Sequence, residues 1–370
     1  MANLFNYLAW RGDLPLDKIP FCELDAAVLT RLSYLPLDVI VSSDLTEKIT
    51  LLEATERALA AKKPSDYIWK GDDRLLRILS TCKRFQDLKL SGFVNSINET
   101  TTMQFGAVII ELEEGLRFLS YRGTDKSLIG WQEDFNLFYE FPVPSQTEAL
   151  RYFETAYAAL GGEWMLGGHS KGGNVAIYTA SFCGEAPRKS IRAVYNMDGP
   201  GIEPKYLADS AFDQVRERIV TYMPQSSVIG KMFGHEDKCV VVQSVEHNLW
   251  QHDLYTWKVT RDKFIRMPDT NKTSAFFDQT LTGFVAEMTH EERKQFVEGL
   301  FDLLKSTEHE TFDELAEKWL QSGGKILKSF SRLDGKTRAM IGGKLFLFLK
   351  KAGGNLPDRI KPTKDKNGGT

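Results

Sequence analysis

The spacing of apolar residues predicts alternating strands and helices through the middle of the chain. Two runs rich in β-branched and aromatic residues, 101–112 and 116–122, flank a Glu-Glu-Gly sequence typical of a hairpin turn. Beyond them, helices are expected at 128–139, 146–160, 172–182 and 203–216, and strands at 164–168, 191–197, 218–223 and 238–244. Strands that alternate with helices predict an α/β fold, with a mostly parallel sheet, helices on both faces and an antiparallel edge.

The two ends of the chain have a helical pattern. Residues 1–85 are mostly helical in their periodicity, and strand signals fade again from about residue 270. Amphipathic helices are expected at 275–288, 290–306, 311–320 and 337–351. We therefore predict an α/β domain over 1–265, which includes the helical N-terminal segment, and a helical extension over 266–370. The apolar and then basic run 345–351 could contact a membrane surface or a partner helix, but its shortness favours the inner face of a C-terminal helix.

The composition narrows the choice of partners. Of 370 residues, 42% are hydrophobic and 26% charged, and the net charge of −3 gives no electrostatic basis for binding nucleic acid. The four cysteines are far apart, so the sequence predicts neither a disulfide framework nor a metal site, and it implies no cofactor. With no signal-peptide pattern and no apolar run of membrane-spanning length, we expect a cytoplasmic protein.

The residues from Gly168 to Gly172 match the pattern G-x-S-x-G, with Ser170 at its centre. An apolar strand is expected before them and a helix rich in small residues after them, which is the order that a nucleophile elbow requires. Such a turn holds the serine hydroxyl clear of the backbone, and the two glycines leave room for it. The start of the helix offers backbone N–H groups to a developing negative charge. The pattern therefore predicts that Ser170 is a nucleophile.

A serine nucleophile needs a base, and in this type of site a histidine follows it in the chain. His169 is expected to point away from its neighbour on the turn, whereas His235 precedes the last predicted strand. His290 and His309 lie in the helical C-terminal part, and His247 has the surroundings of a solvated loop residue. His252 follows the last strand between an aromatic residue and a strand-like run, so we prefer it as the base; an ordinary capping or core histidine is the alternative.

The acid that would orient this base is less clearly marked. Asp198 stands at the tip of the strand after the elbow helix, at the edge where functional residues of parallel sheets gather. Its alternative role is that of a turn aspartate before Gly-Pro-Gly. Asp237 lies at the entrance of a strand, and Asp253 is too close to His252 in the chain to reach its ring. We therefore prefer Asp198.

Two hydrogen-bond donors are needed for the oxyanion. The backbone N–H of Lys171, directly after the nucleophile, is the expected first donor. The second is expected from the loop at 120–125, which follows an earlier strand and carries a hydroxyl. The Lys171 side chain is expected to be solvated, with recognition of an anionic substrate head group as the alternative.

Several motifs carry a family resemblance. The sequence at 121–125, with its continuation at 130–134, resembles the F-R-G-[ST] oxyanion segment and W-x-x-D motif of class 3 (fungal-type) lipases. The elbow and residues 195–201 resemble an uncharacterised bacterial family of α/β-hydrolases related to those lipases. Further similarity to that family lies at 3–7, 32–35, 224–230 and 251–257, so the resemblance covers roughly residues 1–260.

This resemblance implies an α/β-hydrolase fold, a lipase-like catalytic triad and a Thr124 that assists the oxyanion hole. One departure matters. Class 3 lipases take their acid from an Asp-x-[VI]-P motif after the penultimate strand, where this chain has Gln225, Ser226, Ser227 and Val228. The acid has therefore moved to Asp198, or it is missing.

Together these features predict a serine hydrolase that cleaves a small-molecule or lipid ester, or a thioester, through an acyl-enzyme. An acyl pocket is expected at the apolar residues Met223, Val228, Ile229, Met232 and Phe233, for which ordinary core packing is the alternative. A peptidase or acyltransferase would use the same triad. The displaced acid and the helical extension favour another alternative, a catalytically silent scaffold or interaction protein of the hydrolase fold. The sequence does not identify a protein partner of the C-terminal helices.

Overall fold

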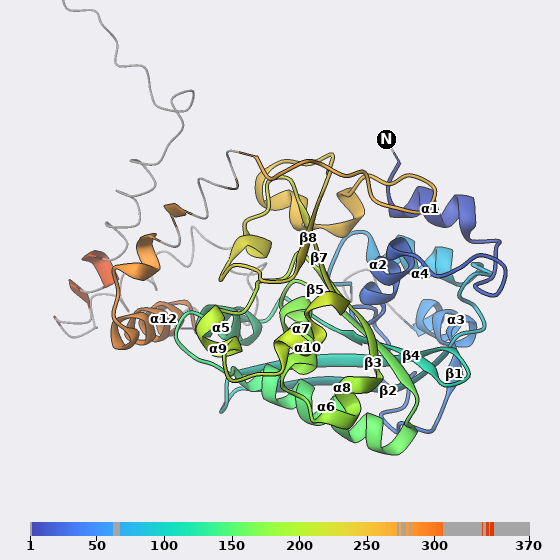
Figure 1. The fold of residues 1–370 in the computed structure, drawn as a ribbon, viewed down its shortest axis with the longest axis horizontal. Helices are drawn as coiled ribbons and strands as arrows, with labels where there is room; N and C mark the ends of the chain where they lie inside the picture. The colour runs from blue at the N-terminus through green and yellow to red at the C-terminus, as the bar shows by residue number, and fades with distance from the viewer. Residues whose placement is uncertain are drawn as a thin grey trace, which may run out of the picture.

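One mixed sheet of eight strands organises the part of the chain that the structure describes. The structure is a computed structural model that describes residues 2–61, 67–271, 274, 279–280, 283–305, 335, 338–339 and 341–343. The strands are β1 Ile49–Thr50, β2 Lys89–Asn98, β3 Met103–Glu113, β4 Leu116–Tyr121, β5 Glu163–His169, β6 Ile191–Met197, β7 Ile219–Pro224 and β8 Lys238–Val242. Each strand pairs with its neighbours in the sequence, from β1 at one edge to β8 at the other (Figure 1).

The sheet changes character at β4. Pairing is antiparallel from β1 to β4 and parallel from β4 to β8. The sheet is therefore of the α/β type, but its antiparallel part is larger than the single edge pair predicted. Strand β2 begins at Lys89, and its pairing with β3 shifts between Ser91 and Val94, next to a Gly92 with φ of 60°. This bulge and the polar, exposed second half of β2 weaken the alternation that marks a strand in a sequence.

Helices cover both faces of the sheet. They are α1 Leu4–Arg11, α2 Glu23–Leu32, α3 Leu51–Ala61, α4 Asp72–Leu79, α5 Leu128–Asn136, α6 Pro144–Leu160, α7 Lys171–Phe182, α8 Glu185–Ser190, α9 Pro204–Leu207, α10 Phe212–Val215 and α12 His290–Lys305. Along β3, Val108 and Ile110 belong to the core shared with α1 to α4, whereas Ala107 and Ile109 belong to the core shared with α6 and α7. This two-residue alternation separates two apolar cores, one on each face. Figure 1 shows the N-terminal helices in blue, apart from the green α6 to α8.

The helix predicted at 203–216 is divided. Pro204 opens α9, which ends at Leu207, and α10 begins only at Phe212. Between them the Ser210 hydroxyl accepts a hydrogen bond from the Phe212 N–H, so the side chain takes the place of a helical carbonyl. A short 3₁₀ turn, η2 Arg216–Arg218, then leads into β7.

Part of the predicted C-terminal extension is described. The helix predicted at 290–306 is present as α12, which lies beside α5, where the rings of Phe135 and Phe301 meet at 5.5 Å (Figure 1). The helix predicted at 311–320, the run 345–351 and most of the helix at 337–351 lie outside the described residues. The boundary between 265 and 266 stays a prediction.

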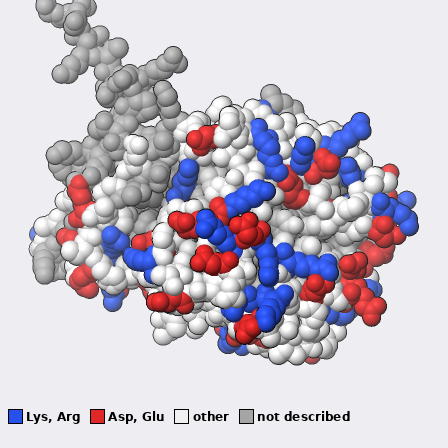
Figure 2. Space-filling view, viewed as in Figure 1, with Lys and Arg blue, Asp and Glu red and all other residues white. Residues whose placement is uncertain are grey.

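Positive and negative charges are mixed over the surface in view (Figure 2). Figure 2 shows acidic and basic side chains interspersed on this face, without a large area of one sign. Among the helices formed by described residues, none is both long and apolar enough to cross a membrane.

Candidate active site

The carboxyl ends of the parallel strands bring the predicted site residues to one edge of the sheet. Ser170 follows β5, Asp198 follows β6, and His252 ends the 3₁₀ turn η4 Asn248–His252, in the segment after β8. Thr124 lies in the loop after β4, which is parallel to β5. In an open parallel sheet these loops share one edge, and this is where ligands bind.

Ser170 sits on a strained turn between β5 and α7. Its φ of 60° and ψ of −133° are unusual for a residue other than glycine, and its N–H donates to the Met197 carbonyl at 2.9 Å. A Cβ on Gly168 would overlap the Gly172 backbone, and a Cβ on Gly172 would overlap the Tyr121 carbonyl oxygen. Both glycines of the motif are therefore required by close backbone packing. The Ser170 hydroxyl forms no hydrogen bond to any residue that the structure describes.

His252 and Asp198 form a close pair. Nδ1 of His252 lies 2.7 Å from Oδ2 of the buried Asp198. The other carboxylate oxygen accepts a hydrogen bond of 2.5 Å from the Ser227 hydroxyl, which itself accepts one from the Gly230 N–H at 2.9 Å. Because Nδ1–H donates to the carboxylate, Nε2 of His252 is left as the proton acceptor. The structure thus brings together the histidine and the acid preferred from the sequence.

Next to this pair, His169 is a residue whose role the sequence did not predict. Its ring is buried, its centroid lies 4.5 Å from that of His252, and its Nε2 lies 2.7 Å from the His252 carbonyl oxygen. Nδ1 faces a nitrogen of the Arg31 guanidinium at 3.5 Å, and a guanidinium can only donate. His169 therefore carries its hydrogen on Nε2 and donates it to His252. Burial, His252 and Arg31 hold the pKa of His169 well below its usual value, so the ring stays neutral.

Arg31 is itself held by the N-terminal helices. Its guanidinium is buried, bonds the Asp72 carboxylate at 2.7 Å and lies 4.1 Å from the centre of the Tyr34 ring. Tyr255 also donates to Asp72, at 2.7 Å. Helices α2 and α4 and the turn η5 Leu254–Thr256 thus form the wall behind His169. One sequence signal points to this arrangement: residues 32–35 and 251–257 are both similar to the same lipase-related bacterial family.

The predicted oxyanion loop packs directly on the elbow. The Gly123 N–H donates to the Tyr34 hydroxyl at 2.9 Å, and that hydroxyl donates to the His169 carbonyl at 3.0 Å. A Cβ on Gly123 would overlap the same carbonyl and lie 3.1 Å from Cβ of Ser170, so only glycine fits there. Thr124 is the next residue, and its hydroxyl donates to Asp134 at 2.5 Å.

The side chain of Lys171 is buried, which contradicts both the solvated lysine and the head-group contact considered for it. Its Nζ donates to a Glu133 carboxylate oxygen at 2.7 Å and to the Gln104 carbonyl at 3.1 Å. Glu133 also accepts from the Ser145 N–H at 2.7 Å. The backbone at the start of α7 directs the lysine toward Glu133 of α5 and Gln104 of β3. Nearby, burial raises the pKa of Asp134 to about 6, although the Lys171 charge opposes the shift.

The predicted acyl-pocket residues lie in two settings. Met223 is buried at the end of β7, in contact with Gly230, and the half-buried Val228, Ile229, Met232 and Phe233 lie in the following loop, where η3 Ile229–Lys231 forms. A pocket near the start of α7 is lined by Leu137, Phe141, Gln146, Asn174, Gly201, Ile202, Glu203, Tyr206 and Phe233. Phe233 is the predicted residue that lines this pocket.

Of the other candidate histidines and acids, those that the structure describes do not join the pair. His247 and His290 are exposed, and His309 lies outside the described residues. Asp253 caps η5 by accepting from the Tyr255 N–H at 2.9 Å. Asp237 pairs with His235 at the start of β8, at 3.1 Å.

Comparison with known proteins gives one family match. A protein-family model described as Mbeg1-like matches residues 79–302. Comparison with curated proteins gives no significant match. Among solved structures, the crystal structure of M37 lipase is similar with a TM-score of 0.34 and 16% identity, over 55% of this chain and 68% of that chain. That similarity is too low to establish a shared fold.

Proposed function

The chain belongs to the Mbeg1-like family, and from the geometry of its site we propose that it is a serine hydrolase with an α/β-hydrolase fold that cleaves a carboxylic ester or thioester. The observation that carries the proposal is the 2.7 Å bond from His252 to Asp198, at the sheet edge where Ser170 occupies a strained turn. The resemblance of the oxyanion loop to class 3 lipases, and of the elbow to a family related to those lipases, supports the same chemistry.

In this proposal Ser170 Oγ attacks the substrate carbonyl, and Nε2 of His252 takes the hydroxyl proton. Asp198 holds the ring and stabilises the imidazolium. Collapse of the tetrahedral intermediate transfers that proton to the leaving alcohol or thiol and leaves the acyl group on Ser170. Water then attacks the acyl-enzyme with His252 as base, and the carboxylic acid product is released. Ser170 Oγ makes no hydrogen bond to His252 in this structure, so the mechanism requires the two groups to come within hydrogen-bond reach when substrate binds.

The backbone N–H groups of Lys171 and Thr124 are the proposed oxyanion donors. Among the described residues neither N–H has a hydrogen-bond partner, and that of Lys171 belongs to the first turn of α7, where helix N–H groups lack internal acceptors. The Thr124 hydroxyl is engaged with Asp134, which fixes the loop beside Ser170. Each donor of this kind lowers the barrier by roughly 3 kcal/mol.

The position of the acid is compatible with this mechanism. In class 3 lipases the acid comes from the loop that here holds Ser227, after β7. In this chain the Ser227 hydroxyl donates to Asp198 at 2.5 Å, so the loop supports an acid supplied by the preceding strand. The Asp198 carboxylate binds His252 through Oδ2 and accepts the Ser227 hydrogen bond at Oδ1.

The proposed substrate is a small-molecule or lipid ester. Among the predicted contacts of its acyl group, Phe233 lines the small pocket beside α7 together with Phe141 and Tyr206. Met223, Val228, Ile229 and Met232 stay predictions as further contacts of the acyl group.

A fluorophosphonate probe tests the proposal, because it reacts with activated serines. The parent protein should be labelled at Ser170, as located by mass spectrometry of the labelled peptide. Ser170→Ala should not react, and His252→Ala and Asp198→Asn should react slower by roughly 10⁴-fold or more. His247→Ala is the matched control, since this exposed histidine precedes His252 by five residues and takes no part in the His252–Asp198 pair.

Equal labelling of the His247→Ala variant and the parent is required for the comparison to hold. A folded parent protein that does not react would contradict the proposal and favour the scaffold alternative. Normal labelling of Asp198→Asn would remove the role of that acid alone.

A further inference from the structure

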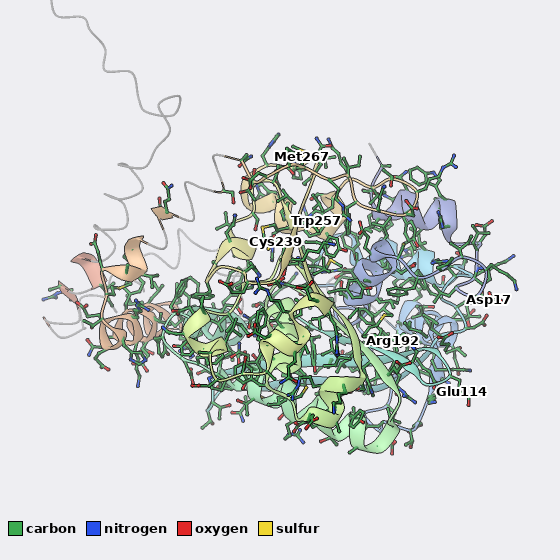
Figure 3. The ribbon with its side chains drawn as sticks, viewed as in Figure 1. Asp17, Glu114, Arg192, Cys239, Trp257 and Met267 are labelled. Atoms are coloured by element: carbon green, nitrogen blue, oxygen red, sulfur yellow. The ribbon has the colours of Figure 1, made fainter. Side chains whose placement is uncertain are left out.

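A second cluster of reactive side chains lies where the chain enters β8. His235, Asp237 and Cys239 alternate along this short segment, and one ligand atom of each lies within 4.8 Å of the other two. The His235 and Asp237 side chains are only 4% and 2% exposed, whereas Cys239 is exposed (labelled in Figure 3). The proposed hydrolase mechanism uses none of the three.

The outer atoms of the histidine and the carboxylate are fixed by other groups. Nε2 of His235 lies 2.8 Å from the Gly230 carbonyl oxygen, which can only accept, so Nε2 carries a hydrogen. The Asp237 oxygen Oδ2 accepts from the Thr221 hydroxyl at 2.6 Å. Protein ligands of metal ions are oriented in the same way, by hydrogen bonds at their far atoms.

The other ring nitrogen of His235 and the other carboxylate oxygen of Asp237 face each other. Nδ1 of His235 and Oδ1 of Asp237 are 3.1 Å apart, and Nδ1 also lies 3.4 Å from the Thr221 hydroxyl. With its hydrogen on Nε2, a neutral His235 presents an acceptor to the carboxylate, and a cation between the two atoms would remove this repulsion. Donor atoms bound tetrahedrally to zinc at about 2.0–2.1 Å lie about 3.3 Å apart, close to the observed separation.

Cys239 supplies the third donor. Its thiol makes one long contact, to the Asp237 carbonyl at 3.8 Å. A thiol that coordinates a divalent ion loses its proton outright and binds as the thiolate.

We propose that His235 Nδ1, Asp237 Oδ1 and Cys239 Sγ bind a divalent transition-metal ion of the zinc type, with water in a fourth position. Binding releases the thiol proton, and the exposed cysteine side gives the ion access. A set of one imidazole, one carboxylate and one thiolate favours zinc-like ions over magnesium or calcium, which prefer oxygen ligands alone. The sequence did not predict this site, because its spacing matches no common zinc motif.

Cobalt(II) is the probe for the test, because thiolate-bound tetrahedral cobalt absorbs strongly in the near ultraviolet and visible. The full-length protein, stripped of metal with a chelator, is titrated with cobalt chloride. We expect a thiolate-to-cobalt band that saturates at one equivalent and disappears when zinc is added. Cys239→Ser should lose this band and bind cobalt more than about 100-fold more weakly.

Cys22→Ser is the matched control, since Cys22 is partly buried and distant in the chain from this cluster, and this variant should keep the band. Cys239 is exposed, so its replacement should leave the circular dichroism spectrum unchanged. Absence of the band in the parent, or an equal band in Cys239→Ser, would overturn the proposal. His235 and Asp237 would then be a hydrogen-bonded pair without a metal ion.

Discussion

His169 and Ser170 are neighbours whose surroundings are opposite. The serine lies on a turn at the end of a strand, and its hydroxyl has no partner among the described residues, so it can meet a substrate. The histidine is enclosed by Arg31 and Tyr34 and donates to the His252 carbonyl. A neutral, buried ring makes a poor base but a good support, because its orientation and its tautomer are both fixed. We infer that His169 is a positioning residue for His252.

Replacing His169 tests this role. His169→Phe keeps a ring of similar size but removes the donor to the His252 carbonyl, so the fluorophosphonate reaction should slow by about 10–100-fold. His169→Gln can place an amide N–H near the position of Nε2 and should recover part of the rate. The measurement is the second-order labelling rate at several pH values. His247→Phe serves as control, and equal rates for the Phe, Gln and parent proteins would contradict the role.

The elbow and its histidine–acid pair could be predicted from the sequence because local order determines them. A strand, a serine between glycines and a helix place Ser170, and the tips of later strands place Asp198 and His252. The roles of His169 and Lys171 could not be predicted, because their partners are distant in the chain. Arg31 is 138 residues from His169, and Glu133 is 38 residues from Lys171. Nothing in one sequence identifies such contacts.

At the scale of elements, one buried ion pair joins α7 to α5. Lys171 opens α7 and Glu133 lies in α5, and their side chains are 2% and 0% exposed. Glu133 also accepts from backbone N–H groups of Gln104 and Ser145, which belong to β3 and α6. Four elements therefore meet at one carboxylate. The pair fixes the elbow relative to the helix that follows the oxyanion loop.

Lys171→Met should destabilise the fold by about 3–5 kcal/mol, because it leaves the Glu133 carboxylate buried without a counter-charge. The double variant Lys171→Met/Glu133→Gln should recover most of this loss, since the Glu133 charge is removed together with its counter-charge. Urea denaturation gives the free energy of unfolding of each. Lys189→Met is the control, because it removes a lysine from an exposed pair with Glu185 and should have little effect. A double variant as unstable as the single one would contradict the role of charge.

Most elements of the sheet could also be predicted, since strands buried on both faces and amphipathic helices have strong patterns. The structure confirms β6 at 191–197 as predicted and extends the helix at 146–160 back to Pro144. The predicted pattern departs from the structure at two places. The helix predicted at 203–216 is divided near Ser210, whose hydroxyl accepts from the Phe212 N–H, and the bulge at Gly92 interrupts the alternation of β2. Such local choices depend on tertiary packing, which a pattern does not contain.

For the whole molecule, Asp134 should make stability depend on pH. Burial raises its pKa from an ordinary value of 3.8 to about 6, so the folded protein binds more protons than the unfolded chain between these values. Stability from this group is therefore lost as pH rises from 4 to 6. Asp134→Asn removes that loss. We expect the variant to gain roughly 3 kcal/mol relative to the parent between pH 4 and pH 7.

Urea denaturation of both proteins at several pH values measures this difference. Asp209→Asn is the control, because this aspartate is exposed and its replacement should give a difference that does not change with pH. A difference for Asp134→Asn that is equally flat would show that the carboxyl is ionised throughout the range.

The order of the strands has a consequence for biosynthesis. Because every strand pairs with the one before it, a chain that emerges from the ribosome can extend the sheet at a single growing edge, without inserting a late strand between early ones. The proposed nucleophile, acid and base arrive in that order, at residues 170, 198 and 252. A nascent chain can therefore hold a folded elbow for several seconds of translation while it still lacks the imidazole that would make the serine reactive.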